Sequence, residues 1–493
     1  MLWNFFEISE QFLNDDKSRL LSQGYFGVER ESQRITSYGD LALTPHPQVF
    51  GDKAENPRIT TDFSESQIEM ITPPFRTVEE VYDSLKQIYA EVENGIKDEL
   101  LWPISMPPRL PDEELIPIAR FSDSEEGRLK EVYRNGLATR YGKKMQMISG
   151  LHYNFSFDDE MIDFLYERFG KGKKKQTFIN NMYFALARNF LRYRWMLIYL
   201  FGASPFCDPT YYSVIYKELE VVQKCCQDCC DVIKNFNKYA TSLRVSRFGY
   251  SNSIQRKYFV YYNSLNEYIQ KLQKMMTTKS SKYLKLGLYN RDTQIQLNGN
   301  VLQKESEFYS SVRVKQNINK GETQLDALAK RGVKYLEVRI LDINPFEKQG
   351  ISVEQLKFLQ VFMLYCLFEK SDDITAHELE KINTNHHLTA LFGRKKNLML
   401  YRYDNGKIPM KEFGEKIFEK LFYIAKLMDT STGESKYKQC VENEYKKLID
   451  LSLLPSERIN REMKENNENY LKFGLRQVEK NNNKNDIKIT KIS

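Results

Sequence analysis

The sequence lacks the short motifs that mark the most familiar nucleotide-binding and hydrolytic sites. It contains no G-x-x-x-x-G-K-[ST] loop, no G-x-G-x-x-G turn, no H-E-x-x-H helix and no G-x-S-x-G elbow. These absences argue against a P-loop, a dinucleotide fold, a zincin site and a serine-hydrolase elbow. If the protein uses a nucleotide, its site must lie on a sheet and contain several metal ions.

The chain also lacks a strong excess of charge of either sign. Its 73 basic and 66 acidic residues give a net charge of +7, and the two signs are interspersed over 493 residues. Because no long basic helix stands out, we predict no binding to nucleic acid. A mildly basic surface still attracts small anions such as nucleotides. The hydrophobic content of 41% indicates a folded globular protein.

Long uninterrupted apolar runs are missing. The most apolar stretch, residues 178–201, contains Arg188, Arg192 and Arg194. Three arginines in one membrane span are costly, so we predict a buried helix and no membrane partner. The segment Met1 to Glu7 has neither a basic region nor a small-residue cleavage site. We therefore expect no secretory signal and a cytoplasmic location.

Only seven cysteines occur, and four of them form a cluster. The cluster is Cys225, Cys226, Cys229 and Cys230. Such spacing on a helix suits a soft-metal site or a redox switch. The alternative is a helix that uses cysteine as a small apolar residue, and we favour it because no second Cys/His pair lies at zinc-ribbon spacing. The odd total fits a reducing compartment.

The apolar pattern changes period several times along the chain. Helical spacing is found at residues 1–22, 78–101, 125–136, 160–235, 265–277 and 356–368, and alternation at 24–35, around 69, and at 147–156, 294–300, 309–315 and 335–339. Strands scattered among helices without regular βα alternation predict an α+β fold with a curved, mostly antiparallel sheet. We expect one domain over residues 1–475, helical from about 350, and a flexible tail over 476–493.

The alternating segments carry unusual polar residues. In Gly27 to Glu31, Glu29 and Glu31 share one face of the strand, and Val28 and Arg30 share the other. Two carboxylates about 7 Å apart can each reach a different hard cation. An exposed strand in which Arg30 bridges the two acids is the alternative. Taken singly, Asp62 and Glu69 are ordinary polar residues.

His152 is one of five histidines, and it shares a strand face with Asn154 and Ser156. Glu337 and Arg339 likewise share a face. An arginine beside a metal-binding glutamate is what phosphoryl transfer requires, because cations and a guanidinium spread the charge of the γ-phosphate. Ligands dominated by oxygen suit Mg²⁺ or Mn²⁺ better than zinc. A lone histidine in a strand is more often structural, so the neighbours carry this interpretation.

Five segments together resemble a known family. They are Gly27 to Glu31, Ile59 to Phe63, Trp102 to Pro107, Ile148 to Ser156 and Tyr335 to Arg339. In order over about residues 20 to 350, they resemble glutamate–cysteine ligase, more narrowly its monofunctional proteobacterial class. The resemblance implies ATP-dependent ligation of the L-glutamate γ-carboxylate to the L-cysteine amine through γ-glutamyl phosphate. This reaction gives γ-glutamylcysteine and is the first step of glutathione synthesis.

The resemblance also implies a funnel-shaped sheet akin to that of glutamine synthetase, a monomer, and feedback binding of glutathione. It assigns Arg339 to the transferring phosphoryl group and Arg244 to the glutamate. The implied metal ligands are Glu29, Glu31, Asp62, Glu69, His152 and Glu337, and the implied cysteine pocket is lined by Phe63, Tyr133, Tyr250 and Tyr309.

Two rival functions remain at this point. A related ligase that joins a carboxylate to another amine would share the chemistry and differ in the acceptor pocket. A catalytically silent relative kept for binding or regulation would have lost site residues, whereas all six implied ligands and Arg339 are present. A bifunctional enzyme that also makes glutathione is disfavoured, because we find no length for a second ATP-using module.

Overall fold

The computed structural model describes residues 3–14, 17–225, 237–250, 257–403, 406–430 and 433–482. The side chains of the clustered cysteines, Cys225 to Cys230, lie outside the described part, so both interpretations of that cluster stand untested.

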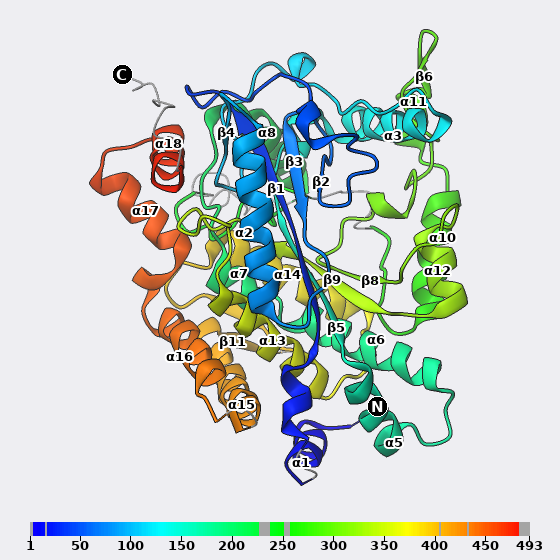
Figure 1. Cartoon of the computed structure of the whole chain (residues 1–493), viewed down its shortest axis with the longest axis vertical. Coiled ribbons are helices and arrows are strands. Elements are labelled where there is room, and N and C mark those ends of the chain that lie inside the picture. Colours follow the sequence, from blue (N-terminus) through cyan, green and yellow to red (C-terminus); the bar gives the residue numbers. More distant parts are fainter. Residues whose placement is uncertain are drawn as a thin grey trace.

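A single antiparallel sheet runs through the centre of the molecule (Figure 1). Its strand order is β2-β3-β1-β5-β9-β8, and β4 pairs with β1. Every pairing in it is antiparallel, and β2 and β8 are its two outer strands, so the sheet is open. The predicted α+β class with a mostly antiparallel sheet is confirmed. The strands are β1 (Gly24–Ile35), β2 (Ile59–Thr60), β3 (Gln67–Ile71), β4 (Leu100–Leu101), β5 (Leu151–Phe157), β8 (Val312–Lys315) and β9 (Tyr335–Leu341).

Strand register brings the polar residues of different segments together. Glu31 of β1 lies opposite Glu69 of β3, and Glu29 lies opposite His152 of β5. On the other side of β5, Asn154 lies opposite Glu337 of β9. Because side chains of directly paired residues lie on the same face of a sheet, these pairings gather the acids on one face.

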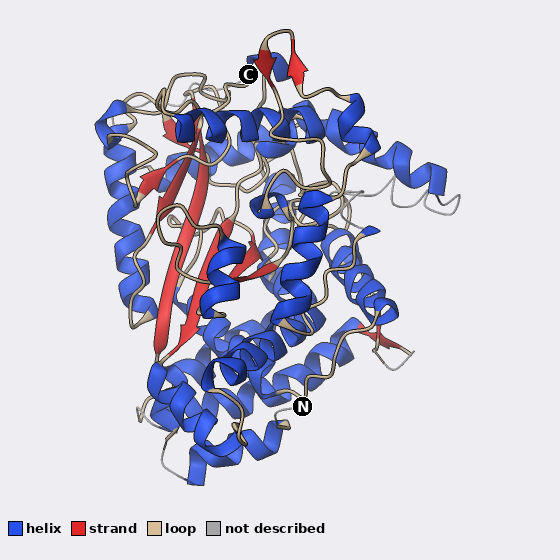
Figure 2. Ribbon diagram, turned by 90° about the vertical axis from the view of Figure 1, so that its right-hand side faces the viewer, coloured by secondary structure: helices blue, strands red, loops and turns tan. Residues whose placement is uncertain are grey.

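Helices surround the sheet (Figure 2). The N-terminal half contributes α1 (Phe5–Asn14), α2 (Val78–Gly95), α3 (Glu125–Tyr141), α4 (Lys143–Gln146), α5 (Asp159–Phe169), α6 (Lys175–Tyr193), α7 (Trp195–Phe201) and α8 (Tyr212–Cys225). Further along the chain follow α10 (Leu265–Thr277), α11 (Ser281–Lys285), α12 (Gln324–Arg331), α13 (Val353–Phe368) and α14 (Ala376–Phe392). The last helices are α15 (Met410–Thr430), α16 (Lys436–Ile449), α17 (Pro455–Glu465) and α18 (Tyr470–Asn481). Two small hairpins, β6 (Tyr289–Asn290) with β7 (Thr293–Gln294) and β10 (Met399–Tyr401) with β11 (Lys407–Pro409), complete the elements.

The second face of the sheet is covered by α2, which lies along β1 and β3 in Figure 1. Its buried residues recur at helical spacing and include Val81, Leu85 and Val92. Arg30 lies on this face, with its guanidinium 4.5 Å from the centre of the Tyr89 ring. The idea that Arg30 bridges Glu29 and Glu31 is therefore wrong, because the strand points it to the opposite side.

Two apolar helices of the sequence are also buried in the structure. The α13 helix is buried on nearly every side, as predicted. The apolar stretch 178–201 forms α6 and α7, and its arginines bond to protein groups: Arg192 pairs with Glu378, and Arg194 donates to Asn383. None of the helices in the described part has the length and apolar character needed to cross a membrane.

Several predicted boundaries differ in the structure, and three of the differences are instructive. The strand expected at 294–300 is wrong: only Thr293–Gln294 is extended, and the buried Gln296 side chain instead donates to the carbonyls of Tyr283 and Gly287. The helix expected to reach residue 101 ends at Gly95, since Lys97 has a φ of 48°, and Leu100–Leu101 pairs with β1. The tail expected from 476 begins inside a helix, because α18 continues to Asn481. Residues 483–493 lie outside the described part.

The packing of α2 onto the sheet gives the first prediction. Leu85→Ala removes a fully buried side chain from α2 and should lower the free energy of unfolding by about 2–5 kcal/mol. Lys86→Ala, at the next and exposed position, is the matched control and should change it by less than about 0.5 kcal/mol. Urea unfolding followed by circular dichroism measures both. Equal effects would mean that α2 does not bury this face.

Candidate active site

The acids and the histidine singled out in the sequence lie on one face of the sheet and around one cavity. The cavity has a volume of about 1060 Å³. Its lining includes Glu29, Glu31, Asp62, Glu69 and His152, and the Glu337 carboxylate lies within 4.8 Å of the Glu29 and His152 donor atoms. Segments separated by more than 300 residues therefore build one polar site.

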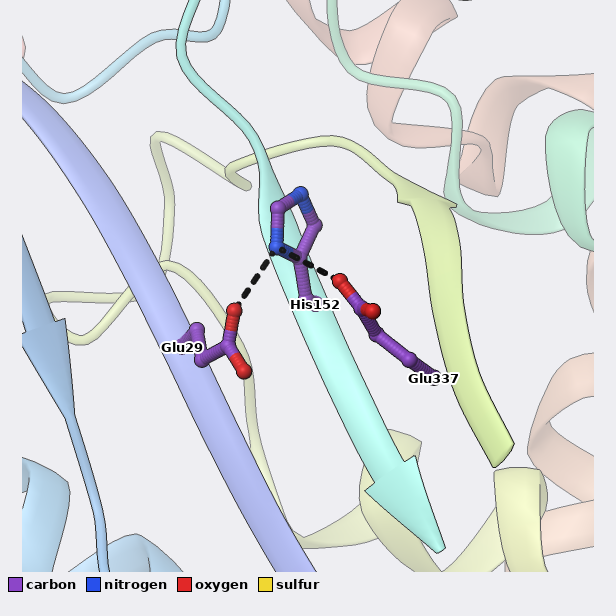
Figure 3. Close-up of side chains that lie close together, drawn as sticks. All are labelled: Glu29, His152 and Glu337. Atoms are coloured by element: carbon purple, nitrogen blue, oxygen red, sulfur yellow. Dashed lines mark hydrogen bonds and ion pairs between the residues drawn. The ribbon is translucent and has the colours of Figure 1, made fainter. Parts of the chain in front are cut away.

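The first group of possible metal ligands spans β1, β5 and β9. His152 Nδ1 lies 3.0 Å from Glu29 Oε2 and 3.7 Å from Glu337 Oε1 (Figure 3). Asn154, two residues further along β5, donates to Glu29 Oε1 at 2.8 Å. The Asn154 amide thereby fixes the rotamer of Glu29 and leaves its other oxygen facing the histidine.

A second group lies on the β3 side of the same histidine. It consists of Glu31, Glu69 and His152, whose donor atoms again lie within 4.8 Å of one another. His152 Nε2 is 3.8 Å from Glu31 Oε1, and the Gly150 amide donates to Glu31 Oε2 at 2.6 Å. The two acids of β1 thus take part in different groups, and His152 belongs to both. Asp62 lines the cavity but belongs to neither group.

Mutual repulsion and burial make this acidic site costly without cations. Burial, reinforced by the Asp62 charge, raises the pKa of Glu31 to about 8. Burial and the charges of Glu29, Asp62 and Glu31 raise the pKa of Glu69 well above its usual value. Burial followed by the Arg339 charge lowers the pKa of His152, so its ring is neutral and able to bind a metal. Carboxylates held neutral in this way ionise when divalent ions arrive.

Arg339 is the cation nearest to the first group. It forms an ion pair with Glu337, and its Nη1 lies 3.4 Å from His152 Nδ1. Although burial opposes both charges, Arg339 together with Lys315 and Arg313 brings the pKa of Glu337 well below its usual value. The carboxylates of Glu337, Glu31 and Glu29 in turn raise the pKa of Arg339. A buried, permanently charged guanidinium beside an ionised carboxylate can stabilise a transferring anion.

The donor set fits hard divalent cations. Each group offers two carboxylates and one imidazole, with no thiolate among the described ligands. Glu337 Oε2 is buried and accepts no hydrogen bond from the described residues, although Lys315 Nζ approaches to 3.3 Å. A buried carboxylate oxygen that accepts no hydrogen bond is suited to coordinate Mg²⁺ or Mn²⁺, which prefer oxygen ligands.

Aromatic side chains form another wall of the cavity. Tyr133, Tyr250 and Tyr309 line it, and the Tyr250 and Tyr309 rings stack with centres 5.7 Å apart. Tyr250 donates to the Ile148 carbonyl, and Tyr309 accepts from Gln146. Phe63, assigned to the same pocket from the sequence, is 1% exposed and belongs to an apolar core cluster that also contains Tyr133, and it is not in the cavity lining.

Arg244 reaches the cavity from the loop after Ser242. Its Nη2 donates to the Arg339 carbonyl at 3.0 Å, while its Nε donates no hydrogen bond within the described part. A Cβ on Gly150 would lie 2.0 Å from Nη2, so only glycine leaves room for the guanidinium. Arg244 therefore presents unused N–H groups next to Glu31, in a position to bind a carboxylate.

Several residues that shape the site escaped the sequence analysis. Asp342 is fully buried 3.9 Å from Arg244 Nη1 and accepts hydrogen bonds from Ala203, Ser204 and Ser242. The β5–β9 register shifts between Leu151 and Tyr153, so simple alternation after Arg339 does not reveal which side Asp342 faces. Other residues in the lining that carried no sequence signal are Gln146, Arg134 and Lys304.

Comparison with known proteins agrees with this geometry. The family model for glutamate-cysteine ligase matches residues 10–389. A glutamate–cysteine ligase from Clostridium acetobutylicum is 64% identical over 480 residues, which cover 97% of this chain and 100% of the relative. A glutamate–cysteine ligase from Pseudomonas syringae pv. syringae is 40% identical over 93% of this chain and 84% of its own.

Comparison with solved structures supports the same family. The crystal structure of a Francisella tularensis glutamate–cysteine ligase in complex with AMP has a TM-score of 0.83 and 34% identity, covering 93% of this chain and 88% of that chain. A bifunctional glutathione synthetase from Pasteurella multocida has a TM-score of 0.76 and 29% identity, covering 96% of this chain and 54% of that one. The family predicted from the sequence motifs is confirmed, and the protein belongs to the glutamate–cysteine ligase family of enzymes.

Proposed function

We propose that this protein joins the γ-carboxylate of L-glutamate to the amine of L-cysteine, using ATP and two or more divalent cations. The products are γ-glutamylcysteine, ADP and phosphate, and the reaction is the first step of glutathione synthesis. The observation that carries the proposal is the convergence of two acid–histidine groups and Arg339 in one cavity of a chain from this family. The AMP complex of the Francisella tularensis relative supports nucleotide use by this fold.

Glu29, His152 and Glu337 would hold one cation, and Glu31 and Glu69, with His152 beside them, a second. Asp62 faces the same space and is close enough to raise the pKa of Glu31 and Glu69, so it is suited to a further cation or to a bound water. Mg²⁺ or Mn²⁺ held there would orient the triphosphate and neutralise its charge.

Arg339 acts on the transferring phosphoryl group. An oxygen of the glutamate γ-carboxylate attacks the γ-phosphorus, the bond to the ADP oxygen breaks, and γ-glutamyl phosphate forms. Negative charge spreads over the phosphoryl oxygens, and the Arg339 guanidinium, fixed by Glu337, donates to them without reorganising. Lys315 and Arg313 add positive charge on the same side of Glu337.

The second step needs an amine close to the acyl phosphate and little water. The cysteine nitrogen attacks the acyl carbon, phosphate leaves with the bonding pair, and the nitrogen loses a proton as the amide forms. Arg244 would hold the glutamate carboxylate, and Tyr133, Tyr250 and Tyr309 would enclose the cysteine, with Phe63 in the core cluster that contains Tyr133. Apolar walls protect the acyl phosphate from hydrolysis.

We place the reaction in the cytoplasm, where reducing conditions keep the thiol substrate free. We further propose that the protein works as a monomer, that glutathione binds in feedback to the same cavity, and that residues 1–475 form one catalytic domain. Packing of α13 against α2 and α6 supports a single domain, since it ties the helical C-terminal part to the helices that flank the sheet.

The test of the function is phosphate release from ATP with one component omitted at a time. Fast release should require glutamate, cysteine and Mg²⁺ together, and mass spectrometry should find γ-glutamylcysteine. If another amine supports faster release than cysteine, the protein is a different carboxylate–amine ligase. If no combination releases phosphate, it is a catalytically silent relative.

Glu337→Gln should lower kcat/KM by about 100-fold or more, because the first group loses an anionic ligand that supplies several kcal/mol in the transition state. Glu444→Gln is the matched control: Glu444 is also buried, but it pairs with Lys447 on α16, away from the cavity lining. It should retain activity within about twofold. Thermal melting checks that both variants fold, and turnover of Glu337→Gln equal to wild type would remove Glu337 from the site.

A further inference from the structure

A buried acid, Asp342, lies next to the arginine that reaches the cavity from the loop after Ser242. Asp342 is fully buried, Arg244 is 2% exposed, and Asp342 Oδ1 lies 3.9 Å from Arg244 Nη1. Arg244 lines the cavity and Asp342 does not, so any effect of Asp342 on a substrate passes through a neighbour. We propose that Asp342 is a positioning residue that holds Arg244 in the orientation in which it binds the carboxylate of the donor amino acid. This inference rests on the proposed ligase function and deepens it.

Three hydrogen bonds fix the Asp342 carboxylate independently of Arg244. Its Oδ2 accepts from the Ala203 amide at 2.8 Å and from the Ser204 hydroxyl at 2.7 Å. Its Oδ1 accepts from the Ser242 hydroxyl at 3.0 Å. Burial raises the pKa of Asp342, and the Arg244 charge together with these three hydrogen bonds opposes that rise. The carboxylate therefore has a defined place beside Nη1, because three donors prevent it from turning away.

The Ser242 hydroxyl also links Asp342 to the main chain around Arg244. Ser242 Oγ donates to Asp342 and accepts from the Val245 amide at 3.3 Å, one residue beyond the arginine. On the other side of the same peptide segment, His386 Nε2 donates to the Val245 carbonyl at 2.6 Å. Asp342 thus acts on Arg244 twice, through the charge beside its guanidinium and through the loop that carries it.

Arg244 has a second acid within electrostatic reach. Burial raises the pKa of Glu31 to about 8, and the Arg244 charge is the largest influence in the opposite direction. The two side chains nevertheless form no ion pair within 4.0 Å in the described part of the chain. An arginine that turned to Glu31 would occupy a proposed metal ligand and leave the donor carboxylate without its partner. Asp342 attracts Nη1 and so offsets the attraction to Glu31.

The separation of the two groups leaves Arg244 able to bind a ligand. Its Nη2 donates to the Arg339 carbonyl at 3.0 Å, whereas Nε and Nη1 donate no hydrogen bond to the described residues. At 3.9 Å, Asp342 is too far from Nη1 for a hydrogen bond, yet close enough for a strong attraction between buried charges. Asp342 therefore orients the guanidinium without using up the N–H groups that a substrate carboxylate requires.

The test compares Asp342→Asn with the wild type. The substitution keeps the size of the side chain and removes the charge that attracts Arg244. We expect KM for glutamate to rise about 10-fold, the scale of coupling within a buried ion-pair network. The kcat at saturating glutamate and the KM for ATP should change less than about twofold, because only donor binding is affected. Equilibrium dialysis of labelled glutamate with Mg²⁺ and a nonhydrolysable ATP analogue should show a matching rise in Kd.

A double-mutant cycle shows whether Asp342 acts through Arg244. Arg244→Gln alone should raise KM for glutamate by more than Asp342→Asn does, since it removes the binding group itself. Adding Asp342→Asn to Arg244→Gln should then change KM by less than about twofold, because the residue through which Asp342 acts is already gone. Independent effects would multiply, so a second rise of about 10-fold in the double variant would overturn the proposal.

Asp429→Asn is the matched control. Asp429 is also buried, and it accepts from the Tyr437 and Lys438 amides, away from the cavity lining. This variant should leave KM for glutamate within about twofold of wild type. Ser242→Ala is a second variant in case Asp342→Asn folds poorly. It removes one hydrogen bond to Asp342, keeps the charge, and should raise KM for glutamate about threefold.

A fall in kcat with unchanged KM and Kd for glutamate, in both Asp342→Asn and Ser242→Ala, would mean that Asp342 only stabilises the fold. That result would also overturn the proposal. Wild-type protein that releases no phosphate with glutamate and any amine would contradict the proposed function itself, so the two failures are distinguishable.

Discussion

Repulsion between buried carboxylates is the constraint on which the rest of the structure depends. Four strands bring together the acids Glu29, Glu31, Glu69 and Glu337 with His152. The pKa values of Glu31 and Glu69 are raised because burial and the neighbouring charges make their ionised forms unfavourable. A fold gains nothing in stability from such a cluster. We propose that it is retained because divalent cations and a triphosphate would supply the missing charges and relieve the repulsion between the carboxylates.

The sheet provides the rigidity that this arrangement needs. Antiparallel register sets Glu31 opposite Glu69 and Glu29 opposite His152, so the spacing of ligands follows from strand pairing and not from mobile loops. The opposite face is anchored by α2, where Arg30 packs on Tyr89. A loop then adds Arg244 beside Arg339, where we propose that it binds the glutamate carboxylate.

Much of the framework follows from the sequence because its alternation is strong. The β1 strand was predicted with both ends correct, and the period of two put Glu29 and Glu31 on a different face from Arg30. The alternation at 294–300 predicted a strand that does not form. The buried Gln296 side chain there donates hydrogen bonds to main-chain carbonyls, and the segment does not pair with a neighbouring strand. The sequence analysis did not identify Asp342 or Lys304 as site residues. A shift in the β5–β9 register determines where Asp342 lies, and a loop determines where Lys304 lies. Only tertiary contacts carry that information.

The most direct test of the central idea is diffraction from crystals soaked in Mn²⁺ and a nonhydrolysable ATP analogue, recorded at the manganese absorption edge. Two anomalous peaks should lie in the cavity, one within coordination distance of Glu29, His152 and Glu337, and the other beside Glu31 and Glu69. Peaks elsewhere, or a cavity that binds the nucleotide while both groups stay empty of metal, would contradict the account.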